Sequence, residues 1–166
     1  MTIPFRGETG HGTYFVTSST WMKKCLLQSY RSAELLIAVM YQYRADKKYL
    51  LHEFVVMPNH FHLLLTPLRP ATLEQAIAMI KGGFSYCAKR SFGFPETIWQ
   101  TSFMDRRVRD HSAYQRFRTY IHENPVKAHL ASTARDFPFS SASGKFDLDE
   151  IPQWLKPLST AAKMQG

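Results

Sequence analysis

Two apolar segments joined by a turn constrain the fold of this chain more than any other feature. Residues 50–57 and 60–66 are both rich in aliphatic and aromatic side chains, and Pro58-Asn59 between them is a turn signal. This pattern predicts a β-hairpin. Because side chains alternate between the two faces of a strand, the continuous apolar run over 60–66 places apolar groups on both faces. A strand of that kind is predicted to be central in its sheet and covered on both sides.

The remaining periodicity predicts helices and strands that alternate around this hairpin. Strands are expected at 13–19 and, as one or two short pieces, within 98–108, and helices at 23–46, 72–89 and 110–124. Gly82-Gly83 is expected to kink or break the second helix, and Pro125 to end the third. The order β-α-β-β-α-β-α predicts an α+β fold of the ferredoxin-like type, an antiparallel sheet with packed helices.

The charge balance points to an anionic partner. The 166 residues contain 21 Lys and Arg against 13 Asp and Glu, which gives a net charge of +8 and a pI of about 9.6. Nucleic acid is the leading partner for such a chain. The alternative is a basic surface without a specific anionic ligand.

The sequence shows no feature of a membrane or secreted protein. The N-terminus has no apolar run of the secretory type, and the longest apolar stretches are far short of the roughly 18 residues of a membrane span. The two cysteines, Cys25 and Cys87, have no metal-binding spacing and are expected to be buried free thiols. A cytoplasmic location and no membrane partner are therefore expected.

His60 and His62 stand at the start of the second hairpin strand. Residues i and i+2 of a strand point to the same face, so both imidazoles can reach one metal ion. Leu64 shares that face. The pair is therefore either part of an apolar core or a set of metal ligands, and a His-x-His pattern alone does not decide between them.

The third predicted helix carries a tyrosine beside possible oxygen ligands. Tyr120 and Asn124 lie one turn apart, and Glu123 lies about 60° around the helix from Tyr120 on the other side. His122 lies on nearly the opposite side and is a poor candidate ligand. The helix therefore presents one amide or carboxylate ligand beside a tyrosine, although a tyrosine in a helix is more often a packed aromatic.

These residue types suit the cleavage of a phosphodiester by attack of a tyrosine on phosphorus. Free tyrosine has a pKa near 10 and needs activation, which a divalent cation on the phosphate can assist. An oxygen ligand favours Mg²⁺ or Mn²⁺, and imidazoles would also accept a softer ion. Basic residues around the tyrosine helix are predicted to contact DNA phosphates, with solvated surface charges as the alternative. They are Lys81, Lys89, Arg90, Arg106, Arg107 and Arg109, with Arg116 and Arg118 added by the helix itself.

Three motifs, MPNHFHLLL, WQTSFMDRRVRD and YIHENPVKAHL, resemble the single-tyrosine HUH transposases of small bacterial insertion sequences, and most of all their REP-associated tyrosine transposase branch. The resemblance covers about residues 10 to 143. It implies an HUH endonuclease core that acts on single-stranded hairpin DNA and leaves a 5′-phosphotyrosine link. His60 and His62 match the histidine pair, Tyr120 the nucleophile, and Asn124 the place where related insertion-sequence enzymes have a glutamine metal ligand. Those relatives are dimers and the REP-associated members look monomeric, so either state is open.

The sequence therefore predicts a metal-dependent DNA endonuclease and strand-transferase, with one domain over residues 1–146 and a C-terminal tail over 147–166. The alternatives are a non-catalytic single-stranded nucleic-acid-binding module on the same fold, and a hydrolase in which water attacks in place of Tyr120.

Overall fold

The structure, a computed structural model, describes residues 10–158. Seven helices and strands form its framework, joined by loops and short 3₁₀ turns. In chain order they are β1 (Tyr14–Ser19), α1 (Tyr30–Ala45), β2 (Tyr49–Met57), β3 (His60–Pro67), α2 (Leu73–Phe92), β4 (Met104–Arg107) and α3 (His111–Lys127).

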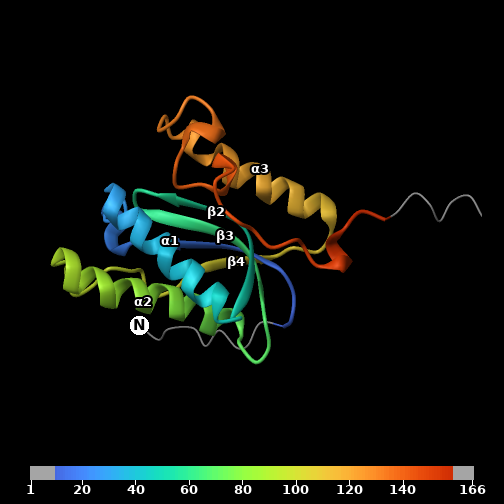
Figure 1. The fold of residues 1–166 in the computed structure, drawn as a ribbon, viewed down its shortest axis with the longest axis horizontal. Helices are drawn as coiled ribbons and strands as arrows, with labels where there is room; N and C mark the ends of the chain where they lie inside the picture. Colours follow the sequence, from blue (N-terminus) through green and yellow to red (C-terminus); the bar gives the residue numbers. More distant parts are fainter. Residues whose placement is uncertain (1–9, 159–166) are drawn as a thin grey trace, which may run out of the picture.

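The four strands form one antiparallel sheet in the order β2-β3-β1-β4. Helices α1 and α2 cover one face of this sheet and α3 covers the other (Figure 1). The predicted α+β antiparallel fold is therefore confirmed, as is the central position of β3, the strand that carries both histidines.

Each face of the sheet has its own apolar core, which follows from the alternation along β3. Phe61 and Leu63 point to the α1/α2 face, where they join a large cluster that includes Phe84 of α2. Leu64 points to the α3 face and joins a smaller cluster with Phe15 of β1 and Ile121 of α3. A side chain on β3 is consequently sealed from solvent on either face, except where a helix ends or leaves a flank open.

The β2–β3 hairpin contains a bulge that changes what β2 presents to α3. Leu51 pairs with Leu65 and Glu53 pairs with Leu64, so His52 is an extra residue on β2. The bulge brings Glu53 to the α3 face among apolar neighbours, although Glu53 is only 5% exposed. A buried carboxylate on a strand needs hydrogen-bond donors, and α3 supplies them as described below.

Helices α1 and α2 differ in detail from the sequence-based expectation. Helix α1 begins at Tyr30 rather than near residue 23, because the Ser29 hydroxyl caps its N-terminus by accepting from the backbone N–H of Ser32 at 3.1 Å. Helix α2 runs without a break through Gly82-Gly83, so the predicted interruption is wrong. The structure also gives a reason for the second glycine: a Cβ on Gly83 would come within 3.1 Å of side chains of α1.

Helix α3 continues past Pro125 to Lys127, so the predicted end at Asn124 is also wrong. Proline lacks a backbone N–H and therefore cannot donate to the carbonyl one turn back. The helix nevertheless continues beyond it, since the carbonyl of Asn124 accepts from the N–H of Ala128 at 3.1 Å, and Pro125 is itself buried. Both cysteines are free, as predicted, but Cys25 is exposed and Cys87 is half-buried.

The chain beyond α3 returns to the outer edge of β2. The N–H of Val56 donates to the carbonyl of Phe139 at 2.9 Å, and Asp149 accepts from the N–H of Leu51 through its carboxylate at 2.8 Å. Leu155, fully buried, joins the core beneath α3. The first part of the predicted tail is thus packed on the sheet, while residues 159–166 lie outside the described range. The domain boundary at residue 146 stays a prediction.

None of the helices formed by residues 10–158 is long and apolar enough to cross a membrane.

Candidate active site

His60 and His62 lie side by side on the α3 face of the sheet, with ring centroids 4.8 Å apart. Each ring is held through its Nδ1 atom. The Thr17 hydroxyl lies 2.8 Å from Nδ1 of His62, and the side-chain oxygen of Asn59 lies 2.7 Å from Nδ1 of His60. Because Nδ1 is occupied in both rings, the Nε2 atoms are the ones left to serve as ligands.

Both imidazoles are in an environment that favours their neutral form. Burial, helped by the charge of Lys23, lowers the pKa of His60. Burial, with a smaller contribution from His60, lowers the pKa of His62 to about 3. A neutral imidazole with a free nitrogen is the form of histidine that binds metal ions.

Helix α3 places Tyr120 and Asn124 against this pair. The ring centroid of Tyr120 lies 5.2 Å from that of His62 and 5.8 Å from that of Phe15, in both cases edge to face. The side-chain amide of Asn124 lies 3.4 Å from Nε2 of His62 and also hydrogen-bonds His60. Tyr120 is 46% exposed, so its hydroxyl remains open to a substrate.

Asn124, and not Glu123, is the third polar group at the histidines. Among residues 10–158, no three His, Cys, Asp or Glu side chains gather in a way that could hold a metal ion. The α3 side chain that lies against the histidines is the carboxamide of Asn124. The oxygen and nitrogen of an amide are assigned from their hydrogen-bond partners, so the Asn124 oxygen can occupy the place facing the imidazoles.

The opposite flank of α3 is fastened to Glu53. This carboxylate accepts from Nε of Arg118 at 2.9 Å and from Nε2 of His122 at 2.8 Å, and also from the hydroxyl of Ser141. Burial acts to raise the pKa of Glu53, but the hydrogen bonds from His122, Ser141 and Arg118 outweigh it and hold that pKa below its usual value. His122 therefore points away from the histidine pair, as the helical spacing predicted.

Sequence reasoning missed Glu53, Thr17 and Ser141. A signal for Glu53 was present, since a glutamate inside the apolar run of 50–57 must find partners if it is buried. Thr17 and Ser141 had no such signal, because their contacts join segments far apart in the chain.

The structure separates the predicted DNA-contacting residues into two groups. Arg106 stands opposite Phe15 in the β1–β4 pair and so lies on the α3 face, while the guanidinium of Arg107 donates to the carbonyl of His11 at 2.9 Å. Arg109 is exposed just before α3. The second group lies on α2, which covers the other face of the sheet. In that group Lys81 donates to the carbonyl of Gln100, Lys89 pairs with Glu96, and Arg90 stacks on Tyr86.

Comparisons with known proteins agree with this arrangement. An antiparallel α+β domain with a histidine pair beside a helical tyrosine belongs to the class of DNA-processing folds that the sequence motifs resemble. The profile of the family described as "Transposase IS200 like" matches residues 13–124, and the chain belongs to this family. None of the curated proteins matches the sequence.

Solved structures share the fold, and two of them illustrate it. One is the REP-associated tyrosine transposase bound to a REP hairpin, with a TM-score of 0.70 and 24% identity over 95% of this chain and 96% of that one. The other is a candidate transposase from Deinococcus radiodurans, with a TM-score of 0.52 and 18% identity over 78% of this chain and 99% of that one. The family profile confirms the resemblance to the transposases of small insertion sequences, and the two structures confirm the fold.

Proposed function

We propose that this chain is a metal-dependent endonuclease and strand-transferase that acts on single-stranded DNA folded into hairpins, with Tyr120 as the nucleophile. One observation carries the proposal: α3 brings Tyr120 and Asn124 to the two histidines of β3, across about 60 residues of sequence. Membership in the IS200-like transposase family supports a DNA substrate.

The reaction follows from the position of Tyr120. Its oxygen attacks the phosphorus of a DNA phosphodiester and loses its proton to solvent. A bond forms between the tyrosine oxygen and phosphorus while the bond from phosphorus to the 3′-oxygen breaks, and that oxygen takes up a proton. The edge-to-face contacts with Phe15 and His62 fix the direction of the phenol ring, which favours in-line attack.

His60, His62 and Asn124 would hold the divalent cation, Mg²⁺ or Mn²⁺. The residues fit such an ion, because both imidazoles are neutral with Nε2 available and the carboxamide contacts both rings. When bound, the ion would withdraw electron density from the scissile phosphate and stabilise charge on its non-bridging oxygens.

The residues that meet here all belong to one chain, so we propose that a monomer suffices for cleavage, with a homodimer as the alternative.

The DNA partner is supported by charge and by the relative bound to a REP hairpin. We propose that Arg106 and Arg109, which share the α3 side of the sheet with Tyr120, contact the strand being cut. Lys81, Lys89, Arg90 and Arg107 are less directly placed, and we propose that they contact only a longer, hairpin-bearing DNA.

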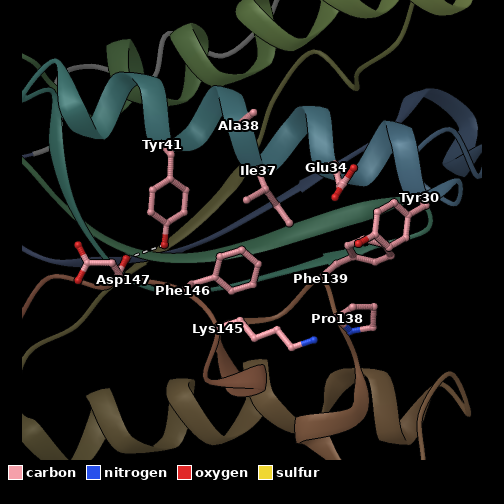
Figure 2. A pocket seen from close by; sticks show the side chains of 10 residues that line it. All are labelled: Tyr30, Glu34, Ile37, Ala38, Tyr41, Pro138, Phe139, Lys145, Phe146 and Asp147. Carbon is pink, nitrogen blue, oxygen red and sulfur yellow. Dashed lines mark hydrogen bonds between the residues drawn. The ribbon is translucent and has the colours of Figure 1, made fainter.

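A covalent-adduct assay tests the nucleophile. Wild-type protein incubated with labelled single-stranded hairpin DNA and Mg²⁺ or Mn²⁺ is expected to give a shifted band on a denaturing gel, and Tyr120→Phe is expected to give none. Tyr30→Phe is the matched control, because Tyr30 is also an exposed helical tyrosine but lies on α1 (Figure 2), which covers the other face of the sheet from α3. An adduct with Tyr120→Phe would exclude this residue as the nucleophile, and strand cutting without any adduct would favour attack by water.

The metal assignment has a readout that does not depend on activity. Titration calorimetry with Mn²⁺ should show binding to the wild type and to Tyr120→Phe, and clearly weaker binding to His62→Ala and Asn124→Ala. Equal binding by His62→Ala and the wild type would remove the histidine pair from the site. DNA binding without adduct and without metal binding would leave the non-catalytic module as the better description.

A further inference from the structure

A basic hollow lies between β4 and the first half of α3. It has a volume of about 390 Å³ and is lined by Arg106, Arg107, Arg109, Asp110, Ala113, Arg116 and Phe117. Four positive side chains therefore face one negative one. The carboxylate of Asp110 is already engaged, because it caps α3 by accepting from the N–H of Ala113 at 2.7 Å. The hollow is consequently suited to an anion.

This hollow and Tyr120 share one flank of α3. Arg116 is four residues before Tyr120, which places it one turn away with a rise of about 6 Å along the helix. Phe15, the cross-strand neighbour of Arg106, is also the residue whose ring contacts Tyr120. Arg118, only two residues beyond Arg116, instead reaches Glu53 on the opposite flank.

Three of the four guanidinium groups are available to a ligand. Within residues 10–158, Arg106 and Arg109 make no ion pair or side-chain hydrogen bond, and both are exposed. Arg116 is exposed and donates only to the neighbouring Ser112 hydroxyl, at 3.1 Å. Arg107 is the exception, because its guanidinium is directed to the carbonyl of His11.

We propose that Arg106, Arg109 and Arg116 form a subsite for the backbone phosphates that adjoin the phosphate attacked by Tyr120. The inference rests on the proposed function and specifies where the cut strand lies. Guanidinium groups bind phosphate oxygens through paired, charge-assisted hydrogen bonds. One turn of helix between Arg116 and Tyr120 is comparable to the distance between neighbouring phosphates in an extended strand. Arg106 and Arg109 continue the path toward β4, which gives the strand a direction away from the active site.

The salt dependence of DNA binding tests the subsite independently of cleavage. Binding of a short unpaired oligonucleotide to the full chain carrying Tyr120→Phe is measured by fluorescence anisotropy between about 50 and 200 mM salt. Each lost phosphate contact is expected to reduce the slope of log K against log salt by about 0.7 for single strands. Arg116→Gln should lower it by about that amount, and the triple change of Arg106, Arg109 and Arg116 to Gln by about 2. The matched control is Arg31→Gln, an exposed arginine of α1 on the other face of the sheet.

A slope in Arg116→Gln equal to that of the Arg31→Gln control would overturn the proposal. A reduced salt slope confined to the subsite variants would support the proposal even if no covalent adduct forms, so that the subsite and the nucleophile are tested separately.

Where an adduct maps the scissile phosphate, a second test follows. Neutral methylphosphonates are placed one at a time at the flanking phosphates. One adjoining position should weaken binding of the wild type but leave Arg116→Gln unaffected, because the partner of that phosphate has gone. Equal weakening of both proteins at every position would refute the contact with Arg116.

Discussion

Replacing Glu53 with alanine is expected to destabilise the fold more than any change to an exposed charge of this chain. Glu53 is 5% exposed and accepts hydrogen bonds from Arg118, His122 and Ser141. It is also the main polar link between β2 and α3. Glu53→Ala removes the acceptor of three donors at once and leaves a small void beneath the helix.

The size of the effect depends on which donors can turn to water. The side chain of Arg118 is 46% exposed and can be solvated, so its loss is worth at most about 1 kcal/mol. The side chain of His122 is only 16% exposed, and a stranded donor there costs roughly 1–3 kcal/mol. Ser141 is buried, but its hydroxyl can still donate to the carbonyl of Phe54, 3.1 Å away, so it loses only roughly 0.5–1.5 kcal/mol. The sum is about 2–5 kcal/mol, which overlaps the roughly 3–5 kcal/mol usual for breaking a buried pair by removing one partner.

Urea unfolding monitored by circular dichroism measures this quantity, provided that a single transition is observed. Arg118→Gln is expected to lose less than about 1 kcal/mol. The matched control is Asp147→Ala, because Asp147 is a carboxylate paired with Arg44 but 86% exposed, and its loss should be smaller still. A loss for Glu53→Ala no larger than that for Asp147→Ala would refute the account of Glu53 as the buried anchor of α3.

Two further predictions concern stability. The pKa of Glu53 is held below the ordinary 4.5, so the stability that its ionised carboxylate contributes is complete above about pH 4.5 and is lost as the pH falls through the folded-state pKa. The difference in unfolding free energy between the wild type and Glu53→Gln should therefore become smaller on acidification. A difference that grows toward low pH would contradict a lowered pKa for Glu53. Gly82→Ala should raise the melting temperature, because nothing lies within 4 Å of the added methyl group and alanine favours the helix by about 1 kcal/mol. Gly83→Ala should gain less stability or lose some, because the same methyl group meets Tyr43 and Val39 at 3.1 Å. Equal gains for the two variants would show that these α1 side chains move aside at no cost.

The sequence predicted those parts of the fold that depend on local pattern. The apolar hairpin over 50–66 identified β2, β3 and the central place of β3, because alternation and turn chemistry are properties of neighbouring residues. The same local geometry placed Tyr120 with Asn124 and turned His122 away. The errors at Gly82-Gly83 and Pro125 have one cause: intrinsic helix propensity was overridden by packing against α1 and against the sheet.

Features that depend on two distant segments could not be predicted. Arg116 and Arg118 are equivalent in the sequence, both basic and both near Tyr120, yet one borders the hollow by β4 and the other binds Glu53. Helical spacing places them on different sides of α3, but only the position of α3 across the sheet determines which groups each of them meets. Lys81 shows the converse. The sequence predicts an exposed cation there, whereas its ammonium group donates to the carbonyl of Gln100 and burial lowers its pKa.

The two flanks of α3 therefore meet different structural requirements, and these requirements explain which residues each flank carries. A nucleophilic tyrosine must be reachable by DNA, so the flank with Tyr120 has to stay open and cannot be fixed by burial. The helix is instead fixed from its other side, where Glu53 receives Arg118 and His122. Because residues 118 and 120 are only two positions apart on one rigid helix, holding the first limits the movement of the second. On this argument a variant that loosens Glu53 should slow formation of the proposed Tyr120 adduct at saturating DNA. Its affinity for a short oligonucleotide should stay nearly unchanged, since the arginines proposed to bind phosphate lie on the flank that Glu53 does not touch.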